Sequence, residues 1–141
     1  SSRDLPDIKY GDQFAKWQGH FRSKGTSSNG NCTSYEYSHP ISTLYFGHKI
    51  AKFIVSVRDG MVVRKVLLFL PNNGDIDVPA SMIDKMEGTL GYKFSHVNND
   101  FGSNYGMKID GTLITVSRMN NGVTEGRDRI VMMVAGVGAC K

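Results

Sequence analysis

The sequence predicts an α+β domain in which an antiparallel sheet of about five to seven strands, built as a hairpin plus a meander, packs against one central helix. Three observations predict this class: a hairpin signature in mid-chain, one amphipathic stretch after it, and alternating apolar segments toward the C-terminus. The 141 residues fit a single domain, residues 1–141, and we expect residues 1–9 to be a flexible N-terminus. The longest apolar run, Val66–Leu70, is far shorter than the roughly 20 residues that cross a bilayer.

The N-terminal part is rich in aromatic residues. Tyr10, Phe14, Trp17 and Phe21 follow one another at intervals of four, three and four, which would place them on one face of a helix that seals one side of the core. Gly19 weakens this interpretation, and the alternation from Trp17 to Phe21 would equally suit a strand. We therefore expect an N-terminal aromatic helix or strand.

Two short segments separate this aromatic stretch from the middle of the chain. Residues Arg22–Thr33 are small and polar throughout, which is typical of a loop, here tethered by Cys32. Residues Ile41–His48 are expected to form a short strand.

A β-hairpin gives the clearest local signal. Ile50–Arg58 and Met61–Leu70 are rich in apolar and β-branched residues, and they flank the dipeptide Asp59-Gly60. Asp-Gly readily adopts the positive φ angles of a type I′ turn, which joins two antiparallel strands through two residues. The sequence therefore predicts a hairpin with a two-residue turn.

This turn sets an expected register for the two strands. Val55 would face Arg64 on a mostly apolar side of the hairpin, and Ile54 would face Lys65 on a mixed side. Arg64 is then the exception on the apolar side, where it would either extend to the sheet edge or pair with an acid in a pocket.

One helix is expected after the hairpin. Pro79 and the sequence Ser81–Asp84, which has the form of a capping box, indicate its start, and Gly88 and Gly91 end it after two to three turns. Its apolar stripe consists of Met82, Ile83, Met86 and Leu90.

The remainder of the chain predicts a meander. Its expected strands are Tyr92–Val97, Met107–Ile109, Thr112–Met119 and Arg129–Val137. Between the first two lies Asn98–Gly106, which we expect to be a loop. It holds two large aromatics, Phe101 and Tyr105, that could anchor a partner or fold back over the sheet.

Two cysteines lie near opposite ends of the chain. A bond between Cys32 and Cys140 would close a loop of about 108 residues, which the loop-entropy model values at nearly 5 kcal/mol. Their spacing fits no compact metal motif, so we expect a disulfide in preference to buried thiols or catalysis. The even cysteine count and the small, polar start of the sequence favour a periplasmic or extracellular protein.

The net charge is mildly positive. Seventeen lysines and arginines against thirteen acids give +4 and a pI near 9.1, but the basic residues are scattered and form no arm. A merely solvated surface and an electrostatic binding face both remain open, and nucleic acid is not the favoured partner.

Catalytic motifs are absent from the sequence. The patterns of P-loop nucleotide sites, α/β-hydrolases, zinc proteases and calcium loops do not occur. Two of the four histidines, His20, His39, His48 and His96, could act with a nearby Lys or Arg as general acid and base on RNA, but no spacing brings two together. We therefore assign no catalytic residue, metal or cofactor.

These observations favour an exported, non-catalytic protein-binding module of the cell envelope, such as an immunity or inhibitor protein that blocks a partner's active site. The candidate partner-binding residues are Phe101 and Tyr105, with Arg64, Lys65 and Arg118 at the margin. The positive charge favours an acidic protein surface as the partner. The alternative is a small secreted histidine-dependent hydrolase, above all a ribonuclease, and a homo-oligomer formed through sheet edges also remains open.

Overall fold

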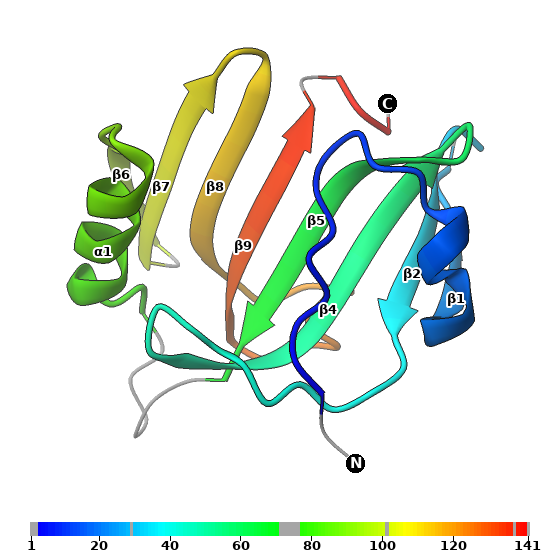
Figure 1. Cartoon of the computed structure of the whole chain (residues 1–141). Helices are drawn as coiled ribbons and strands as arrows, with labels where there is room; N and C mark the ends of the chain where they lie inside the picture. The colour runs from blue at the N-terminus through cyan, green and yellow to red at the C-terminus, as the bar shows by residue number, and fades with distance from the viewer. Residues whose placement is uncertain (1–2, 29, 71–76, 101, 137, 141) are drawn as a thin grey trace.

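A nine-stranded antiparallel sheet, one α-helix and one 3-10 helix make up the regular structure of the described residues in the computed structural model (Figure 1). The structure describes residues 3–28, 30–70, 77–100, 102–136 and 138–140. In chain order the elements are η1 (Ala15–His20), β1 (Phe21–Thr26), β2 (Thr33–Tyr37), β3 (Leu44–Tyr45), β4 (His48–Arg58), β5 (Met61–Phe69), α1 (Ala80–Leu90), β6 (Ser95–Asn99), β7 (Gly102–Ile109), β8 (Thr112–Met119) and β9 (Arg129–Gly136).

The strands follow the order β1-β2-β4-β5-β9-β8-β7-β6, and β3 pairs with β4 outside this path. This confirms a sheet-rich α+β fold, but with more strands than the five to seven expected. The extra strands are β1, which comes mostly from the expected loop Arg22–Thr33, and β2; the other expected loop, Asn98–Gly106, lengthens β6 and β7. Both expected loops lie at the edges of the sheet, where polar side chains can stay in solvent while the backbone pairs on one side.

The β4–β5 hairpin forms as predicted, but its register is different. Asp59 and Gly60 both have positive φ, as a type I′ turn requires. A bulge then places Val63 of β5 as an extra residue, so that Val57 lies opposite Val62 but Ser56 lies opposite Arg64 and Val55 opposite Lys65. The expected pairing of Val55 with Arg64 is therefore wrong, because one inserted residue exchanges the two faces of a strand.

The inner face of the sheet carries the main core. Phe53 and Val55 of β4, Leu67 and Phe69 of β5, and Met132 of β9 are buried there. Figure 1 shows α1 and the N-terminal segment, residues 3–14, lying over this face, while the loop between β8 and β9 passes behind the sheet.

The N-terminal aromatics do not form the expected stripe. Residues 15–20 form a 3-10 helix with no buried residue, so Phe14 and Phe21 at its two ends enter the core while Tyr10 is exposed. Ahead of it, the N–H of Leu5 donates to the Thr43 hydroxyl, and this segment lies across the inner face.

Helix α1 buries three of the four expected stripe residues, Met82, Ile83 and Met86. It ends at Gly91, whose left-handed backbone (φ 79°) closes the last turn, and Gly88 lies inside it. The predicted capping box does not form, because the helix begins at Ala80 with Pro79 as its N-cap. No helix in the described part of the chain has the length and apolar character needed to cross a membrane.

The predicted disulfide joins Cys32, in the β1–β2 turn, to Cys140, which follows β9. Their Cα atoms are 5.2 Å apart. This bond ties an edge hairpin to the end of the central strand β9, and it is compatible with an extracellular or periplasmic protein.

Candidate binding groove on the outer face

A cavity of about 420 Å³ lies on the outer face of the sheet, which faces away from α1. Its floor is formed by β2, β4, β5 and β9, and one wall is the β8–β9 loop, residues 120–128. We call this cavity the groove. Its lining residues are Lys24, Ser34, Glu36, Lys52, Ile54, Ser56, Arg64, Val66, Met119, Asn121, Gly122, Val123, Glu125, Val131 and Met133.

One half of the groove is apolar. Val66 and Val131 belong to a second, smaller hydrophobic cluster, against which Ile54, Met119 and Met133 pack. These side chains come from alternate positions of four strands, because residues two apart on a strand share one face. The methionines make this surface adaptable, since their unbranched side chains can repack around a ligand.

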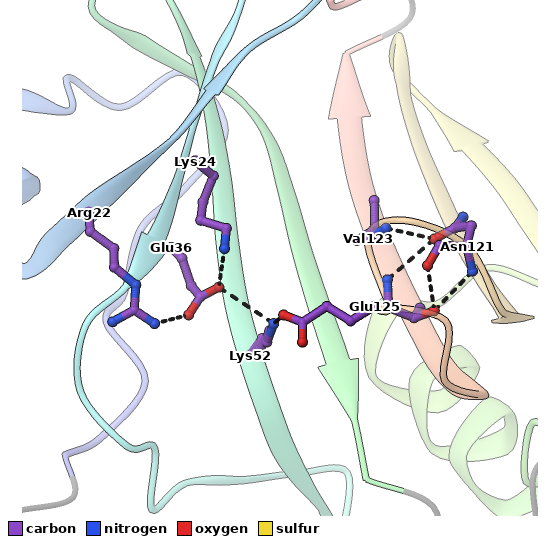
Figure 2. Close-up of polar contacts among 8 residues, drawn as sticks. Arg22, Lys24, Glu36, Lys52, Asn121, Val123 and Glu125 are labelled. Carbon is purple, nitrogen blue, oxygen red and sulfur yellow. Dashed lines mark hydrogen bonds and ion pairs between the residues drawn. The ribbon is translucent and has the colours of Figure 1, made fainter.

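The other half is charged, and it is organised around a buried carboxylate (Figure 2). Glu36 of β2 is only 5% exposed, and Arg22 forms an ion pair with one of its oxygens. Its other oxygen, Oε1, lies 3.6 Å from the Nζ of Lys24 and 3.8 Å from the Nζ of Lys52. The two lysines compensate the charge of this oxygen, but Oε1 is buried and accepts no hydrogen bond from the described residues.

Lys52 connects this cluster to the wall of the groove. Its ammonium also pairs with Glu125 of the β8–β9 loop, and Figure 2 shows the chain of charges running from β1 and β2 across β4 to that loop. The hydrogen bond and the charge of Lys52 lower the pKa of the Glu125 carboxyl. The Lys52–Glu125 pair therefore ties the loop to the sheet.

The loop itself is held by an Asn121 turn. The Asn121 side-chain oxygen accepts hydrogen bonds from the N–H groups of Val123, at 3.0 Å, and Thr124, at 3.4 Å. The buried Thr124 hydroxyl accepts from the Asn121 N–H at 2.9 Å. Asn and Thr side chains stabilise tight turns in this way, and the result places Val123 and Glu125 at the wall of the groove.

Arg64 lines the groove in the row of residues next to Ile54 and Val66, on the side of the β4–β5 turn. Its Nε donates to the Ser56 hydroxyl at 3.0 Å, and Ser56, which is fully buried, lies 3.2 Å from the Ser34 hydroxyl. The guanidinium is half-buried, and this burial lowers its pKa. Among the residues that the structure describes, Arg64 has no ion pair, so it is a cation without a carboxylate partner.

The structure does not bring the five predicted partner-binding residues together. Arg64 lines the groove, but Lys65 lies on the inner face, beside the N-terminal segment, where burial lowers its pKa. Arg118 pairs with Asp128 at 3.3 Å, and Tyr105 lies on β7 instead of in a loop, half-buried against the core. Phe101 lies outside the described residues.

Of the groove residues only Arg64 was predicted as a site residue, and the linked charges Glu36, Lys52 and Glu125 were missed. None of these three belongs to a binding or catalytic motif, and they are 16 and 73 residues apart. The alternation of Tyr35, Glu36 and Tyr37 indicates only that Glu36 points to the face opposite the tyrosines, and nothing in the local sequence indicates that this carboxylate is buried among cations.

The histidines lie outside the groove. His20 and His39 face each other with 3.3 Å between Nδ1 of the first and Nε2 of the second. His96 stacks on the Tyr105 ring and contacts Asn98. Within the described residues, no three His, Cys, Asp or Glu side chains gather as a metal site.

Comparison of the chain with protein-family models, with curated proteins and with solved structures finds no match. The groove and its charges are therefore the basis for a functional conclusion. Four cationic side chains, Arg22, Lys24, Lys52 and Arg64, stand against the carboxylates of Glu36 and Glu125, which leaves a net charge of +2 around an apolar floor.

Proposed function

We propose that this chain is an exported, non-catalytic protein-binding module, of the immunity or inhibitor kind, whose groove receives an acidic segment of its partner. The half-buried Arg64 guanidinium, without a carboxylate partner in the described structure, is the observation that carries the proposal. In this arrangement the partner's carboxylate binds Arg64, and neighbouring apolar side chains of the partner pack on Ile54, Val66 and Met133.

The energetics favour an anion at this position. A half-buried charge loses part of its hydration, and a hydrogen-bonded carboxylate recovers it. Hydrogen bonds to charged groups are worth about 1.5–3 kcal/mol, and an arginine can bind a carboxylate through two of them. The bond from Nε to Ser56 holds the guanidinium in place before the partner arrives, so less side-chain entropy is lost on binding.

The lining of the groove supports binding over catalysis. Among its lining residues are no histidine and no cysteine. Its two serines contact each other, and Ser56 also accepts a hydrogen bond from Arg64, which cannot act as a base. These contacts give neither hydroxyl a base that would activate it as a nucleophile.

The histidine-dependent ribonuclease is the second candidate, because the fold brings His20 and His39 together. General acid and base groups must stand on either side of the reacting phosphodiester, each within hydrogen-bond reach of it. Facing nitrogens 3.3 Å apart contact each other and leave no space for a phosphate between them. The geometry therefore supports this candidate less than the binding module.

A titration with a defined peptide tests the groove. The probe is a peptide of alternating glutamate and leucine, followed by amide chemical shifts of the ¹⁵N-labelled protein, and the matched control peptide has glutamine for glutamate. We expect shifts confined to β4, β5, β9 and the β8–β9 loop with the acidic peptide. Arg64→Gln should weaken binding by about tenfold or more, since each 1.4 kcal/mol is a factor of ten.

Arg58→Gln is the control variant, because Arg58 is an exposed arginine of the same hairpin outside the groove. It should bind the acidic peptide like the wild type. Equal affinity for both peptides, or equal affinity of both variants, would refute the proposal. Degradation of RNA by the purified protein that is lost in His20→Ala would favour the ribonuclease instead.

A further inference from the structure

His20 and His39 form a pair at one end of the β1–β2 ladder. Phe21 pairs with Tyr37, so His20 immediately precedes one paired residue, and His39 follows the other by two. The Ser38 N–H donates to the His20 carbonyl at 2.9 Å, which continues the ladder between the two histidines. The two imidazoles are therefore brought together by backbone pairing, although 18 residues separate them in the sequence.

Buried aromatic rings lie next to this histidine pair. Phe21 and Tyr37 are buried, and their ring centroids are 5.3 Å apart. The His39 ring meets the Tyr37 ring edge-on, with centroids 5.2 Å apart. His20 is exposed and His39 is partly exposed, so the facing nitrogens are held by the core and are open to solvent.

The spacing of the facing nitrogens matches that of two ligands on one zinc ion. Zinc–nitrogen bonds are about 2.0–2.1 Å long, so two nitrogens bound to one tetrahedral zinc ion lie about 3.3–3.4 Å apart. If the nitrogen–zinc–nitrogen angle were about 90°, the two nitrogens would be about 2.9 Å apart. Nδ1 of His20 and Nε2 of His39 are 3.3 Å apart. We infer that these two histidines bind a Zn²⁺ ion through these nitrogens.

Binding requires both imidazoles to be neutral, with their N–H hydrogens on the outer nitrogens, His20 Nε2 and His39 Nδ1. Two coordination positions of the ion remain for water or for ligands from another molecule, because no third ligand from the described residues joins this pair. This site is therefore a half-site, and it is independent of the groove.

Calorimetric titration of the whole chain with Zn²⁺, with Mg²⁺ as a hard-cation control, tests this inference. We expect saturable zinc binding at pH 7.5 and none of magnesium. His20→Ala and His39→Ala should each weaken it by at least about tenfold, since even loss of an outer-shell partner of a metal ligand costs 10–100-fold. Saturation at one zinc per chain would show water completing the site, and one per two chains would show a second copy completing it; both agree with the inference.

His48→Ala and His96→Ala are the matched controls and should leave the zinc affinity unchanged. Long-range ¹H–¹⁵N spectra provide a second measurement, in which zinc should shift His20 Nδ1 and His39 Nε2 and leave the His96 ring nitrogens in place. Absence of zinc binding, or zinc binding that survives in the His20→Ala/His39→Ala double variant, would overturn the inference.

Discussion

Replacing Cys32 and Cys140 with alanine removes the only covalent link between distant parts of the described chain. The two cysteines are 108 residues apart, and in the chain-entropy model a closed loop of this length stabilises the fold by about 4.8 kcal/mol at 25 °C. Cys32 is 1% exposed, so alanine also leaves a small gap where its sulfur was. We therefore expect the double variant to lose about 3–5 kcal/mol of its free energy of unfolding, a large share of the stability of an ordinary domain.

Urea unfolding followed by circular dichroism measures this loss. A domain of this size loses about 1–3 kcal/mol per molar urea, so the midpoint should fall by about 2 M. The wild-type protein in reductant is the control, because it lacks the bond but keeps both side chains, and it should resemble the double variant. A loss below about 1 kcal/mol in both samples would refute the loop-entropy reasoning. A much larger loss in the double variant than in reduced wild type would assign the effect to the packing of Cys32.

Three further predictions concern local features. Gly88→Ala should raise the free energy of unfolding by about 0.5–1 kcal/mol, because Gly88 is an exposed helix residue with open space around the added methyl group; a loss in urea unfolding would contradict this. Gly102→Ala should cost about 1–3 kcal/mol in the same assay, because the φ of Gly102 is +123° and the new Cβ would lie 2.7 Å from the Asp77 Oδ1; an unchanged stability would contradict it. The backbone N–H of Ser103 lowers the pKa of Asp77, so the contribution of Asp77 to stability is present above about pH 4 and is lost as the pH falls through the folded-state pKa; Asp77→Asn should flatten the acid limb of a stability profile measured from pH 2 to 6, and an unchanged acid limb would contradict this.

Features with a local cause could be predicted from the sequence. The Asp59-Gly60 turn needs only two residues that tolerate positive φ, and the end of α1 needs only a glycine at position 91. The disulfide followed from the cysteine count and the absence of any metal spacing. The turn and the helix end do not depend on how distant strands pack, and the disulfide could be inferred although it is long-range, because the chain has only two cysteines.

Edge strands were harder to predict, because strand patterns report burial. In β1 every residue after Phe21 is exposed, so no apolar alternation distinguishes it from a loop. Tyr105 is predicted in a loop for the same reason, since β6 and the start of β7 are polar. What makes these segments strands is the backbone pairing offered by a neighbour, which the local sequence does not encode.

The candidate groove was predicted only in part. Arg64 could be predicted because it is a charge that interrupts an apolar strand, and in the structure it is the half-buried cation of the groove. Glu36, Lys52 and Glu125 come from three separate segments, and their proximity depends on the order of strands β2, β4 and β5 and on the course of the β8–β9 loop. Strand order is set by long-range packing, so this cluster could not be assembled in advance.

The bulge at Val63 explains both the register error and the position of Arg64 in the groove. Strand β5 is apolar on both sides, with Leu67 and Phe69 facing the core and Val66 and Leu68 facing outward, so its alternation does not identify which face is buried. A strand that is apolar on both faces needs cover on both. The N-terminal segment and α1 cover the inner face, whereas on the outer face the β8–β9 loop covers Leu68 but leaves the groove beside Val66 open. The bulge turns Arg64 toward that opening and Lys65 toward the N-terminal segment, so one inserted residue places a half-buried cation where the apolar surface still lacks cover.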